Sequence, residues 1–248
     1  MKISVITAVY NNRATLADAL DSALAQDHPD TELIVIDGAS TDGTLAVIQR
    51  YAGSLTHVVS APDRGIYDAL NKGLSLAKGD IVGFLHSDDR YANDRVLSRI
   101  DAALADPDID ACYGDLCYVR QEDTDRVVRF WRSGEYQRRR LAWGWMPPHP
   151  TFYARRAIYQ RLGGFDLDYQ IAADYDCLLR FLSVGQITCA YIPEILIHMR
   201  LGGVSNRSLS KILQKSREDY QALQRYQVGG LGTLLMKNLQ KLPQFFQR

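Results

Sequence analysis

The sequence has little that would suit a disulfide-rich, membrane-spanning or nucleic-acid-binding protein. Its 248 residues include four cysteines with neither C-x-x-C pairing nor zinc-ligand spacing, so we expect free thiols in a reducing compartment. No apolar run reaches the roughly 18 residues that a membrane-spanning helix needs. Lys+Arg and Asp+Glu number 29 each, so no net charge favours nucleic acid as a partner. No basic leader with an apolar stretch opens the chain, and we expect no signal peptide.

Two nucleotide-binding fingerprints are absent as well. The Gly-rich segment at 38–43 lacks the Lys-Ser/Thr ending of a P-loop. The pattern G-x-G-x-x-G does not occur. The sequence therefore disfavours P-loop nucleotide hydrolases and oxidoreductases that bind a dinucleotide through that motif.

The composition fits one α/β domain of enzyme size with a small appendage. Hydrophobic residues make up 46% of the chain and charged residues 23%, an ordinary globular balance. The charge is unevenly distributed, because the segment from Arg207 to the end has eight Lys/Arg and two Asp/Glu. A basic tail on an acidic body predicts a docking surface for something anionic.

Short apolar runs alternate with helical patterns in the first half of the chain. We expect strands at 3–9, 32–37, 56–60 and 81–85, and helices at 14–26, 42–51 and 66–77. This alternation predicts an α/β fold with right-handed βαβ units and a mostly parallel central sheet covered by helices on both faces. Further along we expect helices at 96–104, 174–183 and 209–226, a hairpin of 111–119 with 127–131, a loop at 143–150 and a strand at 188–192.

Polar segments follow the four expected strands, and three of them carry carboxylates. Asp37 follows the second strand, Asp63 the third, and Asp88 and Asp89 the fourth. Ligands of open α/β sheets bind outside the carboxyl ends of the strands, so we expect these acids to line one crevice. Carboxylates gathered in one place repel one another, and a bound cation relieves that repulsion.

Among these segments, Ser87-Asp88-Asp89 is the most specific indication of a metal site. Two carboxylates at a strand end can hold Mg²⁺ or Mn²⁺ while leaving coordination positions for phosphate oxygens. Ser and Asp are also common in turns and helix caps, and that alternative stays open here. It stays open for Asp174 too, which precedes an expected helix.

Four segments in this order resemble the family 2 glycosyltransferases with the GT-A fold. They are ISVITAVYN at 3–11, ELIVIDGASTDG at 32–43, DRGIYDALNKG at 63–73 and FLHSDD at 84–89. GGFD at 163–166 with AADYDCLLR at 172–180 extends the likeness, which points to bacterial enzymes of exopolysaccharide or surface-polysaccharide synthesis. The resemblance implies a GT-A domain at 1–205, with a Rossmann-like nucleotide-sugar-binding half at 1–91 and an acceptor half at 92–205. It leaves 206–248 as a basic amphipathic helical extension.

The resemblance also implies roles for matching positions. It assigns binding of the donor nucleotide-sugar to Val9, Tyr10, Asn11, Asp37, Asp63, Arg64, Asp68, Asn71, Lys72, Ser87 and Asp88. Asp89 is the implied ligand of Mg²⁺ or Mn²⁺, and Asp174 the implied catalytic base. Ala173 stands where the family has a Glu before this base, which alters the local electrostatics.

The implied reaction is inverting transfer of a hexosyl-type group from a nucleoside-diphosphate sugar, UDP by default, to an acceptor hydroxyl. The acceptor is expected to be a glycan or a lipid-linked glycan in bacterial polysaccharide synthesis. We expect a cytoplasmic enzyme. Whether it also binds peripherally to the inner face of the cell membrane stays open at this point. A nucleotidyltransferase acting on a sugar phosphate and a non-catalytic nucleotide-sugar-binding subunit are the alternatives.

Three aromatic or imidazole side chains are weaker candidates. Trp145 lies in a Pro- and Trp-rich segment and suits either a sugar-stacking wall or a packed loop. His149 is a candidate contact of the diphosphate or metal, and His198 a candidate late ligand, although a lone His is more often structural. The basic amphipathic C-terminal segment suits a membrane surface or packing on protein equally well.

Overall fold

The computed structural model describes residues 1–202 and 209–240 and has a nine-stranded sheet in these segments. The strand order is β3-β2-β1-β4-β8-β6-β9-β5, with β7 beside β6. The strands are β1 (Ile3–Val9), β2 (Thr31–Asp37), β3 (His57–Ser60), β4 (Ile81–Phe84), β5 (Asp89–Tyr91), β6 (Ala111–Val119), β7 (Val127–Trp131), β8 (Tyr153–Arg155) and β9 (Cys189–Arg200). The helices are α1 (Leu16–Leu24), α2 (Thr44–Arg50), α3 (Ile66–Leu76), α4 (Val96–Ala103), α5 (Arg156–Leu162), α6 (Ala173–Leu179), α7 (Leu209–Arg225) and α8 (Leu231–Leu239). Short 3-10 helices η1 (Arg138–Trp143) and η2 (His149–Thr151) and a π-helical segment η3 (Arg180–Val184) complete the chain order.

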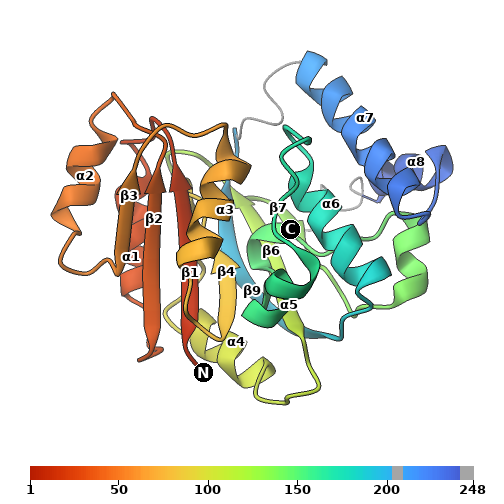
Figure 1. Ribbon diagram of the computed structural model, residues 1–248, viewed down its shortest axis with the longest axis horizontal. Helices are drawn as coiled ribbons and strands as arrows, with labels where there is room; N and C mark the ends of the chain where they lie inside the picture. The colour runs from red at the N-terminus through yellow and green to blue at the C-terminus, as the bar shows by residue number, and fades with distance from the viewer. Residues whose placement is uncertain (203–208, 241–248) are drawn as a thin grey trace.

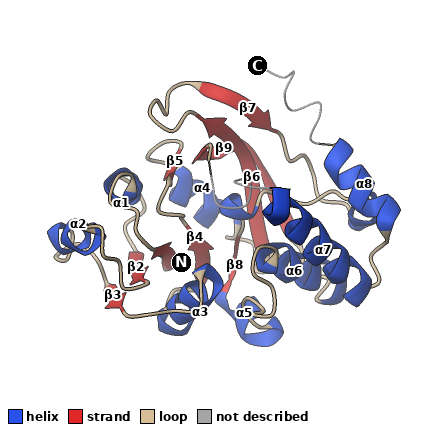
Figure 2. Ribbon diagram, turned by 90° about the horizontal axis from the view of Figure 1, so that it is seen from above, coloured by secondary structure: helices blue, strands red, loops and turns tan. Residues whose placement is uncertain are grey.

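The first half forms the expected parallel sheet. β1 lies between β2 and β4, and β3 pairs with β2, all in parallel register. Every residue of β1 is buried, because α1 and α2 pack on one face of the sheet and α3 on the other (Figures 1 and 2). The βαβ prediction is confirmed, and the carboxyl ends of β1 to β4 share one edge.

The second half is mixed in strand direction. β8 runs antiparallel to β4 and β6, which attaches the second half to the first. β6 and β7 form the expected antiparallel hairpin, and β9 pairs parallel to β6. The expected strand at 188–192 extends to Arg200, while the short strands β5 and β8 and the helix α5 are additions to the predicted pattern.

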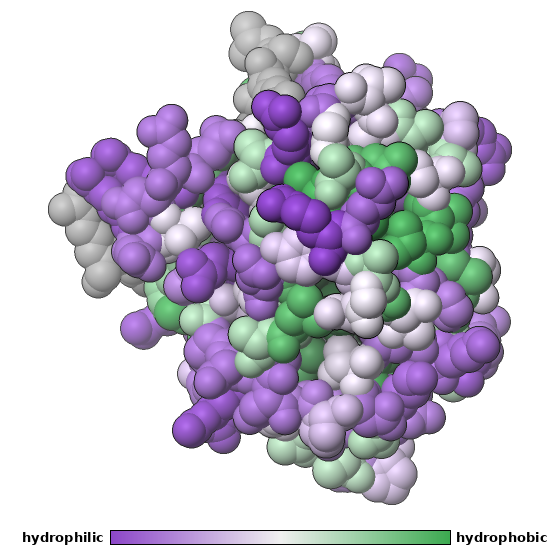
Figure 3. All heavy atoms as spheres, turned by 90° about the vertical axis from the view of Figure 1, so that its left-hand side faces the viewer, coloured by the Kyte–Doolittle hydropathy of each residue, from purple (hydrophilic) through white to green (hydrophobic). Residues whose placement is uncertain are grey.

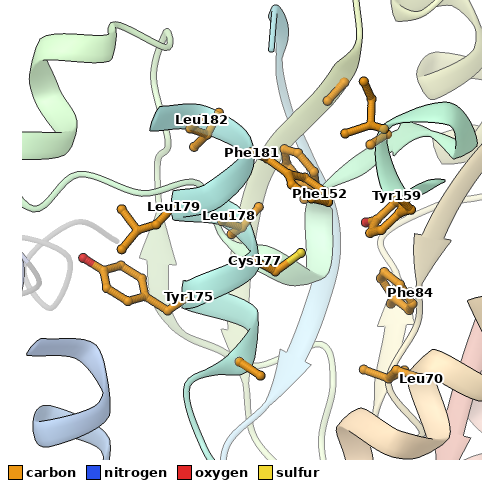
Figure 4. Close-up of a cluster of buried hydrophobic side chains, with 14 of the residues drawn as sticks. Leu70, Phe84, Phe152, Tyr159, Tyr175, Cys177, Leu178, Leu179, Phe181 and Leu182 are labelled. Atoms are coloured by element: carbon orange, nitrogen blue, oxygen red, sulfur yellow. The ribbon is translucent and has the colours of Figure 1, made fainter. Parts of the chain in front are cut away.

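A large apolar cluster joins the two halves on the α3 face of the sheet. Phe84 from β4, Phe152, Tyr159 from α5 and Phe181 from η3 lie in it (Figure 4). Tyr159 meets both Phe84 and Phe181 edge to face, with ring centroids 6.0 and 5.1 Å apart. The cluster fixes α6 relative to the parallel sheet. By contrast, the view onto the α2 side shows mainly hydrophilic side chains with scattered apolar ones, as on an ordinary solvent-facing surface (Figure 3).

The C-terminal helices pack against the second half rather than extending away from it (Figure 1). α7 contacts α6, and α8 contacts both α7 and η1. Gly144 has φ 80° and allows close approach, because a Cβ there would lie 2.5 Å from the backbone N of Lys237. The predicted helix at 209–226 is confirmed, and residues 241–248 of the predicted extension lie outside the described residues. No helix in the described ranges has the length and apolarity to span a bilayer.

Candidate active site at the carboxyl edge of the sheet

Hydrogen bonds tie together the loops that follow β1, β2 and β4. The backbone N–H of Asn11, itself at φ 49°, donates to Ser40 Oγ at 2.8 Å, and the Asn11 side-chain oxygen accepts from Thr41 N–H at 2.8 Å. Asn12 Nδ2 donates to Ser87 Oγ at 2.9 Å, which reaches the loop after β4. The loops after these strands, which the sequence predicted to lie close together, are therefore in direct contact.

A close approach at Gly38 brings in the loop that follows β3. A Cβ at this position would lie 2.6 Å from Asp63 Oδ2 and 3.2 Å from the Tyr10 ring. Tyr10 is 65% exposed, so its ring presents a free face beside the Asp63 carboxylate. Val9, just before it, has its side chain buried in the core. An aromatic face beside a carboxylate suits recognition of a nucleoside.

Asp37 is buried under the loops after β2 and β3 and bonds to the loop after β2 and to the end of β3. Its carboxylate accepts hydrogen bonds from Ser60 Oγ at 2.5 Å and from the Ser40 backbone N–H at 3.2 Å. The residue has no exposed surface. The predicted contact of Asp37 with a nucleobase therefore requires the 38–43 loop to move, since its oxygens now hold that loop.

Asp68 gathers two cations at the start of α3. Arg64 Nη2 lies 3.3 Å from its carboxylate, and Lys72 Nζ lies 3.2 Å away. Hydrogen bonds from the Arg64 backbone N–H and from both cations lower the pKa of Asp68. The Arg64 side chain is largely exposed, so this end of α3 presents positive charge beside the Tyr10–Asp63 surface.

Asn71, which was predicted to bind the donor nucleotide-sugar, instead bonds to the backbone of Phe165. Its Nδ2 donates to the Phe165 carbonyl at 2.8 Å, and its Oδ1 accepts from the Phe165 N–H at 2.9 Å. Gly164 is needed beside it, because a Cβ there would lie 2.4 Å from Asn71 Oδ1. Asn71 thus secures the 163–166 loop, and both functional atoms of its amide are occupied there.

Asp88 and Asp89 follow β4 and differ sharply in environment. Asp88 is half-buried, whereas Asp89 is completely buried and neither of its oxygens has a hydrogen-bond partner among the described residues. Burial and then the charge of Asp88 raise the pKa of Asp89 well above its usual value, against the smaller opposing effects of the Arg200 backbone N–H and the Arg200 charge. Arg200 donates to the Asp88 carbonyl at 2.9 Å and so anchors the turn.

This donor set fits a hard divalent cation that is shared with a ligand. An orphaned buried carboxylate is costly, and a cation bound to it removes that cost. Within 1–202 and 209–240, no group of three or more His, Cys, Asp and Glu side chains is arranged to hold an ion alone. Mg²⁺ and Mn²⁺ sites on phosphate substrates commonly use one or two carboxylates, with phosphate and water oxygens supplying the rest.

Asp174 lies in the first turn of α6 and is held at both oxygens. Tyr67 Oη donates to its Oδ1 at 3.1 Å, and His149 Nδ1 lies 2.9 Å from its Oδ2. Burial acts to raise the pKa of Asp174, but the charge and hydrogen bond of His149 outweigh it and the net shift is downward. The helix-cap alternative fails here, since the N-cap of α6 is Ala172 and the Asp174 oxygens bond elsewhere.

α7 completes the support of this helix. Glu218 Oε2 accepts from the backbone N–H groups of Ile171 and Ala172 at 2.8 and 2.9 Å, so it satisfies donors at the start of α6. Lys215 Nζ lies 3.0 Å from Asp219. Burial opposes the charge on Lys215, but Asp219 and Asp174 raise its pKa overall. The C-terminal helices therefore contribute charge and capping next to Asp174.

Two of the weaker candidates lie elsewhere. Trp145 is buried, donates from Nε1 to the Ser133 carbonyl at 2.8 Å and packs on Tyr113, so its ring offers no sugar-stacking face. The exposed tryptophan of that segment is Trp143. His198 directly precedes Met199, the register partner of Asp89, so its side chain points to the opposite face of the sheet. It lines a separate cavity of about 680 Å³ with Phe130 and Tyr191.

Three residues around Asp174 were not predicted as site residues. His86 received no role, yet its Nε2 lies 3.1 Å from Nε2 of His149. Tyr67 stands inside the DRGIYDALNKG segment, one residue before Asp68, and position in that motif was the only available signal. Glu218 lies 44 residues beyond Asp174 on a separate helix, which no local pattern connects to it.

The chain is similar to known glycosyltransferases. A family model described as "Glycosyl transferase family 2" matches residues 4–163. The PGL/p-HBAD biosynthesis glycosyltransferase of Mycobacterium bovis (strain BCG / Pasteur 1173P2) is 30% identical over 213 residues, which cover 84% of this chain and 80% of the relative.

Solved structures share the fold. S. aureus TarS 1–349 in complex with UDP-GlcNAc superposes with a TM-score of 0.69 at 20% identity, covering 92% of this chain and 66% of that one. The mannosyltransferase PcManGT from Pyrobaculum calidifontis, in complex with GDP-Man and Mn²⁺, gives a TM-score of 0.69 at 24% identity, covering 99% and 73%. At these identities the likeness establishes the GT-A architecture.

Proposed function

Because the chain belongs to glycosyltransferase family 2, we propose that it transfers a sugar, with inversion, from a nucleoside-diphosphate sugar to an acceptor hydroxyl with the help of a divalent cation. The observation that carries the proposal is Asp89, a buried carboxylate at the carboxyl edge of the sheet whose oxygens have no hydrogen-bond partner within 1–202 and 209–240. Such a group suits a cation, and a diphosphate is the ligand that shares one.

The donor site of this proposal is the surface formed by the loops after β1 to β4. Tyr10 and Asp63 suit the nucleoside, and Arg64 and Lys72 suit the diphosphate, where a guanidinium or ammonium neutralises oxygen charge. Neighbours of the same fold bind UDP-GlcNAc and GDP-Man, so the base stays open, with UDP as our default.

Asp89, with Asp88 beside it, would hold Mg²⁺ or Mn²⁺; the cation neutralises charge on the departing diphosphate. Asp174 is the proposed base. It accepts the acceptor's hydroxyl proton while the acceptor oxygen bonds to the anomeric carbon and the bond to the diphosphate breaks. Attack from the face opposite the leaving group inverts the configuration. Positioning and charge neutralisation supply most of the acceleration.

Product analysis tests the proposal directly. The purified protein is incubated with UDP-, GDP- and dTDP-sugars, Mn²⁺ or Mg²⁺, and a membrane extract as acceptor source. We expect release of a nucleoside diphosphate and a new glycosidic bond with inverted configuration. Asp174→Asn is the matched control, which should still bind donor in calorimetry while transfer falls by about 10³-fold or more. Binding of donors without transfer to any acceptor would instead support a non-catalytic subunit.

A nucleotidyltransferase is the second candidate, since it also uses acidic metal ligands on such a sheet. It would consume a nucleoside triphosphate and a sugar phosphate and release pyrophosphate. The same incubation distinguishes the two, because a coupled pyrophosphate assay responds only to the nucleotidyltransferase reaction.

We propose a lipid-linked glycan as acceptor and a peripheral position on the inner face of the membrane. Leu231, Leu235 and Leu239 recur every fourth residue on α8 and are 44–70% exposed, and Trp143 beside them is 62% exposed. A leucine stripe with a tryptophan in a basic segment suits insertion among anionic headgroups. This supports the membrane alternative for α8, while α7 packs on protein.

Vesicle sedimentation tests the membrane contact. Leu235→Glu should lower binding to vesicles of phosphatidylglycerol and phosphatidylethanolamine by about tenfold, the equivalent of burying one leucine side chain. Val58→Glu is the control, because Val58 is 41% exposed on β3 at the other end of the molecule (Figure 1). Equal binding by both variants and the parent chain would exclude the α8 stripe as the contact.

A further inference from the structure

An unbroken line of polar contacts crosses the site from the loop after β4 to α6. His86 Nε2 lies 3.1 Å from His149 Nε2, His149 Nδ1 lies 2.9 Å from Asp174 Oδ2, and Tyr67 Oη lies 3.1 Å from Asp174 Oδ1. Four elements contribute, namely the β4–β5 loop, η2, α6 and α3. The Tyr67 hydroxyl shares its single proton between Asp174 Oδ1 and the Ile171 carbonyl, which lies 2.7 Å away.

We infer that His149 is a positioning residue for the transfer reaction, holding the Asp174 carboxylate in the orientation that receives the acceptor's hydroxyl proton. The inference rests on the proposed function, because it concerns the base of that reaction. It also assigns His149 a partner other than the diphosphate or metal, the contacts expected for it from the sequence.

The donor at Nδ1 does not depend on the charge of His149. An ionised carboxylate can only accept, so the contact requires a proton on Nδ1, which both the neutral Nδ1–H form and the imidazolium have. His86 Nε2 donates or accepts according to the tautomer of its ring. It can therefore pair with His149 Nε2 in either form.

The consequence for Asp174 is a fixed carboxylate plane. Its two oxygens bind donors from different elements, Tyr67 on α3 and His149 on η2, so rotation about the side chain breaks a contact at each end. Correct orientation of a base before the reaction is worth orders of magnitude in rate, and loss of it appears in kcat.

The fold does not depend on His149 to the same degree. Its side chain is 35% exposed, and Pro150 and Thr151, which follow it, supply the buried contacts of η2. Substitutions at this position should therefore leave a folded protein. The other charged groups around the pair are Lys215 on α7, which interacts electrostatically with Asp174, and Asp88, which interacts with His86.

Two variants of opposite design test the inference. His149→Leu removes the donor, and we expect kcat for transfer to fall by about 10- to 100-fold while the Kd for donor with Mn²⁺, from calorimetry, stays within about twofold. His149→Asn retains an N–H near the position of Nδ1, so it should recover most of that loss. A role in holding the diphosphate would instead raise the donor Kd, and that result would overturn the inference.

A double mutant supplies the second measurement. If His149 acts through Asp174, then His149→Leu in an Asp174→Asn background should lower the residual rate by less than about twofold. An undiminished loss in that background, or a wild-type kcat in the single His149→Leu variant, would overturn the inference. Thermal melting checks that the variants are folded; if His149→Leu is not, Tyr67→Phe, which removes the opposite contact of Asp174, must lower kcat severalfold for the inference to stand. Absence of transfer by the parent chain with every donor would instead contradict the proposed function itself.

Discussion

Two buried carboxylates at opposite ends of the same parallel sheet have opposite surroundings. Glu32, at the amino end of β2, accepts hydrogen bonds from Ser4 Oγ and from the Lys78 N–H at 2.5 Å each, and Lys2 Nζ lies 3.1 Å away. Asp89, beyond the carboxyl end of β4, has no hydrogen-bond partner among the described residues. Hydrogen bonds and Lys2 outweigh burial and lower the pKa of Glu32, whereas burial raises the pKa of Asp89.

This difference separates a structural carboxylate from a functional one. Glu32 links β1, β2 and the turn before β4, and the protein supplies hydrogen bonds to its Oε1 and the charge of Lys2 beside its Oε2. Around Asp89, the backbone N–H and the charge of Arg200 offset only part of the effect of burial, and a bound cation would offset the rest. Substituting each residue should therefore have opposite effects on activity and stability.

The largest effect is expected for the activity of Asp89→Asn. Losing the charge that would hold Mg²⁺ or Mn²⁺ should lower kcat/KM for transfer by about 10²-fold or more, since metal-borne charge stabilisation is worth several kcal/mol. Measuring initial rates over a range of Mn²⁺ concentrations tests this. Rates of Asp89→Asn that match the parent chain would remove Asp89 from the metal site.

The thermal stability of Asp89→Asn provides a second test of the contrast between Asp89 and Glu32. Without divalent ions, Asp89→Asn should melt at or above the temperature of the parent chain, because it removes an unpaired buried charge. Added Mn²⁺ and UDP should raise the melting temperature of the parent chain only, since a ligand bound by the native state stabilises it. Glu32→Gln is the control, and we expect it to keep the parent chain's activity per folded molecule.

The next effect in size is the loss of stability in Glu32→Gln. Removing the charge of this buried carboxylate, which is bonded at Oε1 and paired with Lys2 at Oε2, should lower the free energy of unfolding by about 3 kcal/mol. Urea unfolding at pH 7 measures it. Retention of full stability would mean that the contacts of Glu32 contribute little.

The pH dependence of that difference follows from the sign of the shift. The pKa of Glu32 is lower in the folded state, so its stabilisation is complete above the unfolded pKa of about 4.3 and is lost as the pH falls through the folded value. The difference in unfolding free energy between the parent chain and Glu32→Gln should therefore narrow below about pH 4. A constant difference from pH 7 to pH 3 would contradict this assignment.

The end of the sheet that carries the site was predictable because its elements are long and regular. β1, β2 and α3 match their predicted ranges within one residue at each end, since their apolar periodicity is continuous. β5 and β8, with three residues each, are too short for any period to appear. The order of polar loops after the strands predicted the edge where Asp63 and Asp89 lie, but not that Asp37 is fully buried beneath it.

The partners of Asp174 were not predictable from local patterns. His149 lies 25 residues before it and contacts its carboxylate, while Glu218 lies 44 residues after it and binds the N–H groups of Ile171 and Ala172 just before it; both contacts arise from tertiary packing. The amphipathic pattern of α7 left membrane and protein contacts open, because periodicity reveals an apolar face but not what covers it. Packing against α6 and α8 buries the C-terminal part of the apolar face of α7, at Ala222 and Leu223, whereas Ile212 and Leu213 and the leucine stripe of α8 stay exposed.

Glu218 provides the last and smallest test, since it combines features of both carboxylates. Like Glu32 it is buried and paired, by the N–H groups of Ile171 and Ala172, but it supports the helix that carries Asp174. Glu218→Gln keeps one acceptor oxygen and should cost about 1 kcal/mol of stability, as a weakened helix cap does. It should also lower kcat by about three- to tenfold, because Asp174 lies two residues beyond the capped N–H groups.

Parallel measurements of melting and transfer rates separate the two effects of Glu218→Gln. Ser216→Ala on the same helix is the control, since Ser216 is only partly buried and its hydroxyl donates within α7, to the Ile212 carbonyl. If stability falls while kcat stays at the parent value, then the contact of Glu218 on α7 serves the fold alone, as the contacts of Glu32 do. A fall in kcat shows that the C-terminal helices belong to the active site, so the boundary expected at 205 divides a single functional unit.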